Sequence, residues 1–163
     1  MKANKILTYS FWILCLLCAA CSEIYVVDNQ SAPASITFKQ DDLTIRTAKA
    51  AHHFAIEIAE KPDQQELGLM HRTNLPRDHG MLFIMSGDIP VQMWMKDTLI
   101  PLDMVFIDQQ GKIVYIAANT VPESTAIVTA GRPVRAVLEL AGGTAAMDGI
   151  QVGDRVIHSY FKP

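Results

Sequence analysis

Hydrophobic and polar residues alternate with a period of two along several short stretches of the chain. Residues 54–59 (FAIEIA) show this alternation, which is typical of a strand with one buried face. Residues 81–85 (MLFIM) are continuously apolar and predict a strand that is covered on both faces. The apolar runs at 104–107 and 112–116 flank DQQG at 108–111, which predicts a hairpin whose glycine has a positive φ.

The remaining pattern predicts more strands and one or two short helices. Strands are expected at 91–95, 133–140 and 155–160. Residues 62–70 begin with proline and carry acids early, which favours a short helix, and residues 141–149 predict a helical turn between glycines. The whole pattern predicts a mostly β fold, either an antiparallel β-sandwich or a partly closed barrel.

A separate hydrophobic run lies near the N-terminus. Two lysines precede the apolar residues 6–20, a run shorter than the about 20 residues that a transmembrane helix needs. The run suits a secretory signal, and the small residues before Cys21 resemble the signal of bacterial lipoproteins. We therefore expect residues 1–20 to be a signal peptide and Cys21 to be lipidated. Cys18 departs from the lipoprotein pattern, in which leucine is usual at this position.

The leader also sets the expected location and the domain boundaries. Ser22 fits the outer-membrane sorting type, so we expect an exported protein anchored in the bacterial cell envelope, at the outer membrane and facing the periplasm. Residues 21–51 are polar and contain proline, which predicts a lipidated cysteine followed by a flexible tether. Residues 52–163 are then expected to form a single β-rich domain of ordinary size.

Cysteine usage and charge exclude several classes of protein. All three cysteines (15, 18 and 21) lie in the leader, so the domain has no disulfide, no thiol nucleophile and no cysteine-bound metal. Loss of the two leader lysines and of no acid changes the formal net charge from −3 to −5. Because nucleic-acid-binding proteins carry a basic face, we expect no nucleic-acid partner. Motifs for phosphate loops, nucleophilic serines and zinc-binding His-Glu-x-x-His helices are absent from the sequence.

Residues 93–103 (MWMKDTLIPLD) place polar groups in an apolar run. The polar members are Lys96, Asp97, Thr98 and Asp103. In one interpretation they face a cleft for a sugar or a peptide, with Trp94 as a flat apolar face. In the other they satisfy one another, and Lys96 pairs with Asp103 or Glu139.

Methionine is abundant in the domain and allows two interpretations. Thioethers together with histidines bind Cu(I), whereas methionines also fill irregular gaps in a core, and we favour the second interpretation. The methionines are Met70, Met81, Met85, Met93, Met95, Met104 and Met147. His71 and His79 with Asp78 form a weaker candidate for a metal or acid–base site. Glu57 and Glu139 form a candidate carboxylate pair.

The order of several motifs resembles a known family. The motifs are EIA at 57–59, GLMHR at 68–72, GMLF at 80–83, WMKDTLIPLD at 94–103 and VLEL at 137–140. They are similar in kind and order to the family catalogued as domain of unknown function 192. The resemblance implies a compact, jelly-roll-like β domain, often exported in bacteria, with no established activity, cofactor or catalytic residue. The family usually has asparagine where this chain has Asp97.

We therefore expect a binding or accessory module of the cell envelope that has no catalysis of its own, no cofactor and no metal. The candidate ligand-binding residues are Trp94, Lys96, Asp97, Thr98, Asp103, Arg72 and Glu139. The expected partners are the membrane, through a lipid on Cys21, and an unknown small ligand or envelope protein. Two alternatives stay open: an envelope glycan hydrolase or transferase that uses paired carboxylates, and a structural partner-binding domain.

Overall fold

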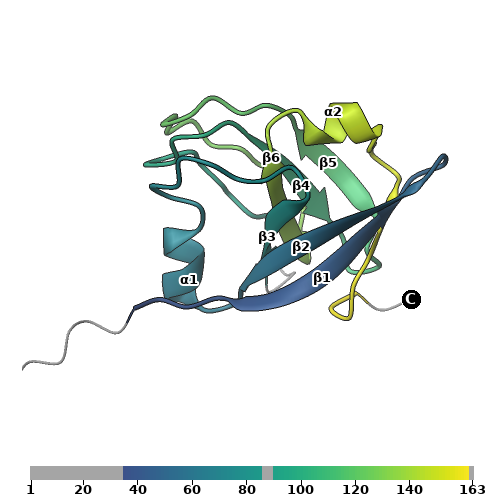
Figure 1. The fold of residues 1–163 in the computed structure, drawn as a ribbon, viewed down its shortest axis with the longest axis horizontal. Helices are drawn as coiled ribbons and strands as arrows, with labels where there is room; N and C mark the ends of the chain where they lie inside the picture. The colour runs from purple at the N-terminus through teal and green to yellow at the C-terminus, as the bar shows by residue number, and fades with distance from the viewer. Residues whose placement is uncertain (1–34, 86–89, 162–163) are drawn as a thin grey trace, which may run out of the picture. The chain divides into compact units, whose positions relative to one another are not determined.

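The computed structural model describes residues 35–85 and 90–161, which form a mostly β domain. Its seven strands belong to one mixed sheet with the order β5-β4-β6-β3-β2-β1-β7 (Figure 1). The elements are β1 (Lys39–Arg46), β2 (Ala51–Ala59), α1 (Pro62–Leu67), β3 (His79–Ile84), β4 (Leu102–Ile107), β5 (Ile113–Ala117), β6 (Ala136–Ala141), α2 (Thr144–Asp148) and β7 (Arg155–Ile157). The predicted mostly β fold with two short helices is confirmed.

The sheet curls until its two edge strands nearly meet, so it forms a partly closed barrel as predicted. Lys112, directly before β5, pairs with Arg155 of β7 in an isolated bridge. The backbone N–H of Val156 donates to the carbonyl of Gly111 at 2.7 Å. Gly111 has a φ of +80°, and a Cβ atom at this position would lie 2.5 Å from the Val156 carbonyl oxygen. Only glycine therefore fits where the two edges approach each other.

The sheet is buried on both faces along its central strands. One apolar cluster takes side chains from all seven strands, including Leu43 of β1 and Val156 of β7, and fills the interior of the barrel. A second cluster covers the outer face of β3, β4 and β6 and includes Met81, Met104 and Phe106. This double burial explains the continuous apolar run at 81–85, where a strand is confirmed.

Strands β2 and β3 are parallel, whereas the other paired strands are antiparallel. A parallel pair needs a crossover connection, and α1 lies in it. The side-chain amide of Gln65 in α1 donates to the carbonyls of Ile84 (2.6 Å) and Ala59 (3.3 Å), at the ends of β3 and β2. These bonds hold the helix against the sheet.

The domain begins before the boundary predicted at residue 52. β1 pairs with β2 along its whole length, from Lys39 with Ile58 to Arg46 with Ala51, and the compact unit starts at Ser35. The strand is hard to detect in the sequence because most of its residues are polar and exposed. The structured part of the predicted tether is therefore an integral strand of the sheet.

The strand predicted at 91–95 is wrong. Pro90 and Met93 form only isolated bridges, with Pro133 and Val128 respectively. Pro90 cannot donate a backbone hydrogen bond, so no regular ladder of hydrogen bonds begins at this residue. The segment instead lies over the outer face of the sheet, where Met93 is bridged to Val128.

Within residues 35–85 and 90–161, no helix is both long and apolar enough to cross a membrane. The predicted signal peptide and the candidate lipidation site at Cys21 lie outside the described residues.

Candidate functional site

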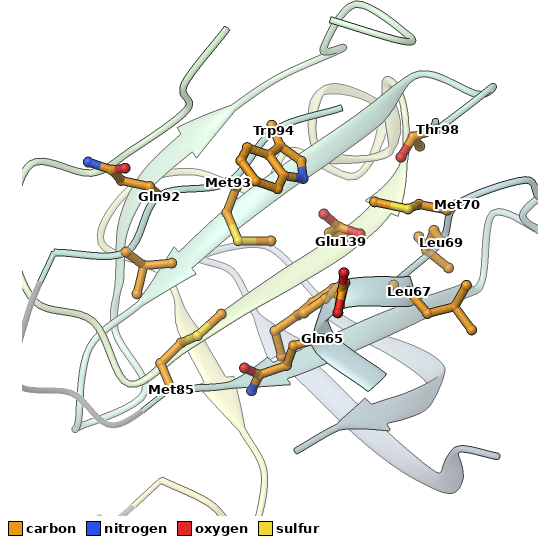
Figure 2. Close-up of a pocket in the computed structure, with 14 residues that line it drawn as sticks. Gln65, Leu67, Leu69, Met70, Met85, Gln92, Met93, Trp94, Thr98 and Glu139 are labelled. Carbon is orange, nitrogen blue, oxygen red and sulfur yellow. The ribbon is translucent and has the colours of Figure 1, made fainter. Parts of the chain in front are cut away.

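A pocket of about 410 Å³ lies on the outer face of the sheet. Phe83 of β3 and Glu139 of β6 line it from the sheet, and Figure 2 shows Glu139 at the floor between the two walls. One wall is the C-terminal half of α1 with residues 68–70, and the other wall is residues 91–94. The volume is within the range of pockets that bind small molecules.

Gly68 allows the helical wall to approach the floor closely. Its φ is +47°, which disfavours other residues, and a Cβ atom there would lie 3.1 Å from the ring of Phe83. The Gln65 bonds to the strand ends hold the same helix from its other side. The pocket wall is therefore fixed by backbone conformation and by hydrogen bonds.

Glu139 is the most unusual residue of the pocket. It is only 4% exposed, and among the described residues no side chain or backbone group forms a hydrogen bond or ion pair with its carboxyl group. Its neighbours on the adjacent strands are Met81 and Met104. Burial raises the pKa of Glu139 from 4.5 to about 8, since water cannot stabilise the carboxylate there. Glu139 is therefore mostly protonated at neutral pH.

Glu57 lies in the same row of paired residues across the sheet as Glu139, but its carboxylate has a hydrogen-bonding partner. Met81 separates the two acids, because it pairs with Glu57 on one side and with Glu139 on the other. Arg72 donates two hydrogen bonds to the Glu57 carboxylate, each 2.7 Å long, and this contact raises the pKa of Arg72. The guanidinium also lies 5.9 Å from the ring centroid of Phe38. Arg72, a predicted ligand residue, is therefore committed to Glu57 and does not line the pocket.

Asp103 is fully buried, and the backbone satisfies its carboxylate. One oxygen accepts from the N–H groups of Asn119 (2.7 Å) and Gly143 (3.0 Å), and the other accepts from Ala145 (2.7 Å). These bonds tie β4 to the start of α2 and to the chain after β5. Asp103 therefore has a structural role.

Lys96 and Asp97 lie on the surface, and the predicted pairing of Lys96 with Asp103 or Glu139 is wrong. The ammonium nitrogen of Lys96 is instead 3.6 Å from a carboxylate oxygen of Asp97, and both side chains are about half exposed. Asp97 has a φ of +54°, a conformation that asparagine and aspartate tolerate best among residues with a side chain. This backbone requirement accounts for either residue at position 97.

Three of the predicted ligand residues do meet at the pocket: Trp94, Thr98 and Glu139. Trp94 is 51% exposed, whereas Thr98 is 5% exposed and its hydroxyl donates to the Lys96 carbonyl at 3.2 Å. Of the carboxylates of Asp97, Asp103 and Glu139, only that of Glu139 lines this pocket, so these three acids do not supply the carboxylate pair that glycan hydrolysis requires. Glu66 and the contribution of α1 could not be predicted from the sequence, because a single exposed acid on a short helix carries no distinctive signal.

Six of the seven methionines fall into two groups, and Met147 is exposed on the surface. Met81, Met95 and Met104 are buried and fill the outer cluster, as the favoured interpretation predicted. Met70, Met85 and Met93 line the pocket instead. No histidine lines it, and the described residues contain no group of three or more His, Cys, Asp and Glu side chains that could hold a metal ion.

Comparisons with known proteins agree with this fold and its motifs. The profile of DUF192, described as "Uncharacterized ACR", matches residues 43–158. The chain belongs to the DUF192 family. No curated protein matches the chain.

Two crystal structures are similar to this DUF192 domain. One comes from Sinorhizobium meliloti 1021 and is named as a candidate transcription regulator; it is 41% identical, covers 78% of this chain and 99% of its own, and gives a TM-score of 0.75. The other is a protein of unknown function from Novosphingobium aromaticivorans DSM 12444; it is 36% identical, covers 79% of this chain and 94% of its own, and gives a TM-score of 0.72.

Two substitutions in this DUF192 domain should distinguish a charge that stabilises the fold from a charge that is merely exposed on the surface. They are Asp103→Asn and Lys96→Met. Asp103→Asn should lower the free energy of unfolding by roughly 2–4 kcal/mol, because it weakens three buried charge-assisted bonds. Lys96→Met should change it by less than about 0.5 kcal/mol, because the side chain is exposed. Urea denaturation measures both, and equal losses would contradict the assignment.

The pH dependence of stability should reveal Glu139. Between pH 4.5 and about 8 the folded state holds a proton that the unfolded state has released, so stability falls as the pH rises. We expect this group to contribute a loss of about 1.4 kcal/mol per pH unit in that window, and Glu139→Gln to remove it. Urea unfolding from pH 5 to pH 8.5 measures the slope.

Glu57→Gln is the matched control for this experiment. It should lower the free energy of unfolding, because it breaks the ion pair with Arg72. The decrease of stability with rising pH that Glu139 causes should remain. If the wild type and Glu139→Gln show the same slope, Glu139 does not retain its proton in the folded state.

Proposed function

We propose that this protein is a ligand-binding module of the bacterial cell envelope, without catalysis of its own, and that its ligand enters the pocket between α1 and residues 91–94. Two parts of this proposal are independent of each other. The binding function rests on the pocket and Glu139, whereas the envelope location rests on the leader and Cys21.

The observation that carries the binding function is the carboxyl group of Glu139, which is buried at the pocket and has no partner in residues 35–85 and 90–161. A buried acid without a partner lowers the stability of a domain, whereas an apolar residue at the same position would not. Ionisable groups with strongly shifted pKa values gather at functional sites, because a ligand or substrate supplies the missing partner there. A role in binding therefore accounts for a residue that the fold does not need.

Binding fits the chemistry of the pocket better than hydrolysis does. Glycan hydrolysis uses two facing carboxyl groups, one of them ionised and held in place. The second acid of this pocket is Glu66, which is exposed on α1. Within the described residues, the better-held carboxylates of Glu57 and Asp103 are already committed to Arg72 and to the backbone.

The name of the Sinorhizobium protein suggests transcription regulation for that protein. For this chain, the leader and the net negative charge favour a role outside the cytoplasm and away from nucleic acid. We therefore place the envelope function first.

Trp94 offers a direct test of the pocket. The chain contains two tryptophans, so Trp12→Phe leaves Trp94 as the single tryptophan in the full-length protein. We expect at least one of three six-carbon probes (1-hexanol, hexylammonium or hexanoate), at about 10 mM, to shift the Trp94 emission and raise the melting temperature. If none of the probes does either, the pocket does not bind small ligands of this size.

Two variants control for nonspecific binding in the same assay. Trp94→Ala should reduce the rise in melting temperature, because it removes one wall of the pocket. Ile127→Ala should leave the rise unchanged, because this exposed residue does not line the pocket.

The envelope location has its own test. The full-length chain, expressed in bacteria with labelled palmitate, should incorporate the label and fractionate with membranes. Cys21→Ser should abolish the labelling, since the lipid is attached at that thiol. Labelling that persists in Cys21→Ser, or that is absent from the wild type, would contradict the lipoprotein assignment.

A further inference from the structure

The charges around the pocket favour one class of ligand. The charged residues that line it are Glu66 and Glu139, and neither lysine nor arginine is among the lining residues. Lys96 lies on the neighbouring segment, but its ammonium faces Asp97 on the surface. An anionic ligand would therefore meet the negative charge of Glu66 and no compensating cation, whereas a cation would be attracted by Glu66 and would stabilise the ionised form of Glu139.

The hydrogen-bonding groups of the pocket also favour a cationic ligand. Two of its donors are already used by the protein: the Gln65 amide donates to strand carbonyls, and the Thr98 hydroxyl donates to the Lys96 carbonyl. The Gln92 amide and the Trp94 indole N–H also line the pocket, but neither forms a hydrogen bond with Glu139. Both oxygens of Glu139 lack a partner among the described residues. A ligand that satisfies an ionised Glu139 must therefore bring its own donors.

The apolar walls suit the body of an organic cation. Trp94 is half exposed at the pocket, and the face of an indole ring attracts cations. Figure 2 shows Met70 and Met93 extending toward Glu139 from opposite sides. Polarizable thioethers adapt to ligands of different shape. A single Cu(I) ion would need these sulfur atoms around one point rather than on separate walls, so an organic cation fits better.

On the premise of the proposed binding function, we infer that the ligand is an organic ammonium ion: a primary amine on a short apolar body. The ammonium group donates to the carboxylate of Glu139, and the body packs against Trp94 and the methionines. The protonated carboxylic acid of the empty pocket gives up its proton to solvent as the ammonium ion binds. Charge and protons balance, because one cation enters and one proton leaves.

Among the described residues, few ionisable groups near the pocket could release or take up a proton when the ammonium ion binds. The strands beside Glu139 present Met81 and Met104 to it, and residues 91–94 and Thr98 carry no ionisable side chain. Glu66 of α1 is the other acid of the pocket, and Glu57 lies one strand further away, held by Arg72. The proton released on binding is therefore assigned to Glu139.

The test compares three probes with the same six-carbon body, using the full-length chain with Trp12→Phe. Hexylammonium should bind at least about tenfold more tightly than 1-hexanol, and hexanoate should bind most weakly. Calorimetry at pH 7 in two buffers of different ionisation enthalpy should show close to one proton released per hexylammonium bound and none for 1-hexanol. Hexylammonium should also bind about tenfold more tightly at pH 9 than at pH 7, because the carboxylate form of Glu139 becomes dominant.

Glu139→Gln and Glu66→Gln provide the matched variants. In Glu139→Gln, hexylammonium should lose its advantage over 1-hexanol, its proton release and its pH dependence. Glu66→Gln should weaken binding only slightly and keep the proton release. If 1-hexanol binds as tightly as hexylammonium and no proton is released, the cation inference is wrong while the binding function stands. If none of the probes binds, the binding function itself fails.

Discussion

The carboxylate of Asp103 is the interaction on which one end of this barrel depends. A charge buried this deeply is tolerable only when several donors surround it, and three backbone N–H groups do so. Those donors belong to the chain after β5 and to the start of α2, which are 16 to 42 residues away in the sequence. One side chain therefore organises three separate parts of the chain and frees the outer face of β6 to form the pocket floor.

Glu139 gains its significance from the contrast with the other acids. Glu57 and Asp103 show that this domain can satisfy a carboxylate in two ways, with an arginine or with backbone donors. Glu139 lies on the strand next to that of Asp103 and two strands from that of Glu57, and among the described residues it has neither kind of partner. This contrast with two satisfied acids on the same sheet is the physical ground for the proposed ligand.

The sequence predicted the local elements well and the long-range contacts poorly. The hairpin around Gly111, the apolar β3 and the helix at Pro62 follow from period, turn residues and helix starts, all of which are local. The extent of β1 and its place in the sheet could not be predicted, because only Leu43 and Ile45 of its eight residues are buried. The pairing of Lys96 was wrong because the backbone turn at Asp97 directs the charged side chains to the surface, and a turn at a positive φ is not visible in the residue pattern. The pocket exists because the crossover connection between β2 and β3 places α1 over the sheet. The residues that line the pocket therefore could not be grouped from their spacing in the sequence alone.

The near closure of the barrel between β5 and β7 has a consequence for contacts between copies of the domain. Open sheet edges recruit strands from neighbouring copies and promote aggregation. In this sheet the two edge strands, β5 and β7, are short. They are joined at one end by the bridge between Lys112 and Arg155 and by the hydrogen bond between Val156 and Gly111. The unpaired backbone that another copy could extend is therefore short and flanked by positive charges, which protects a crowded population of these domains from assembling edge to edge.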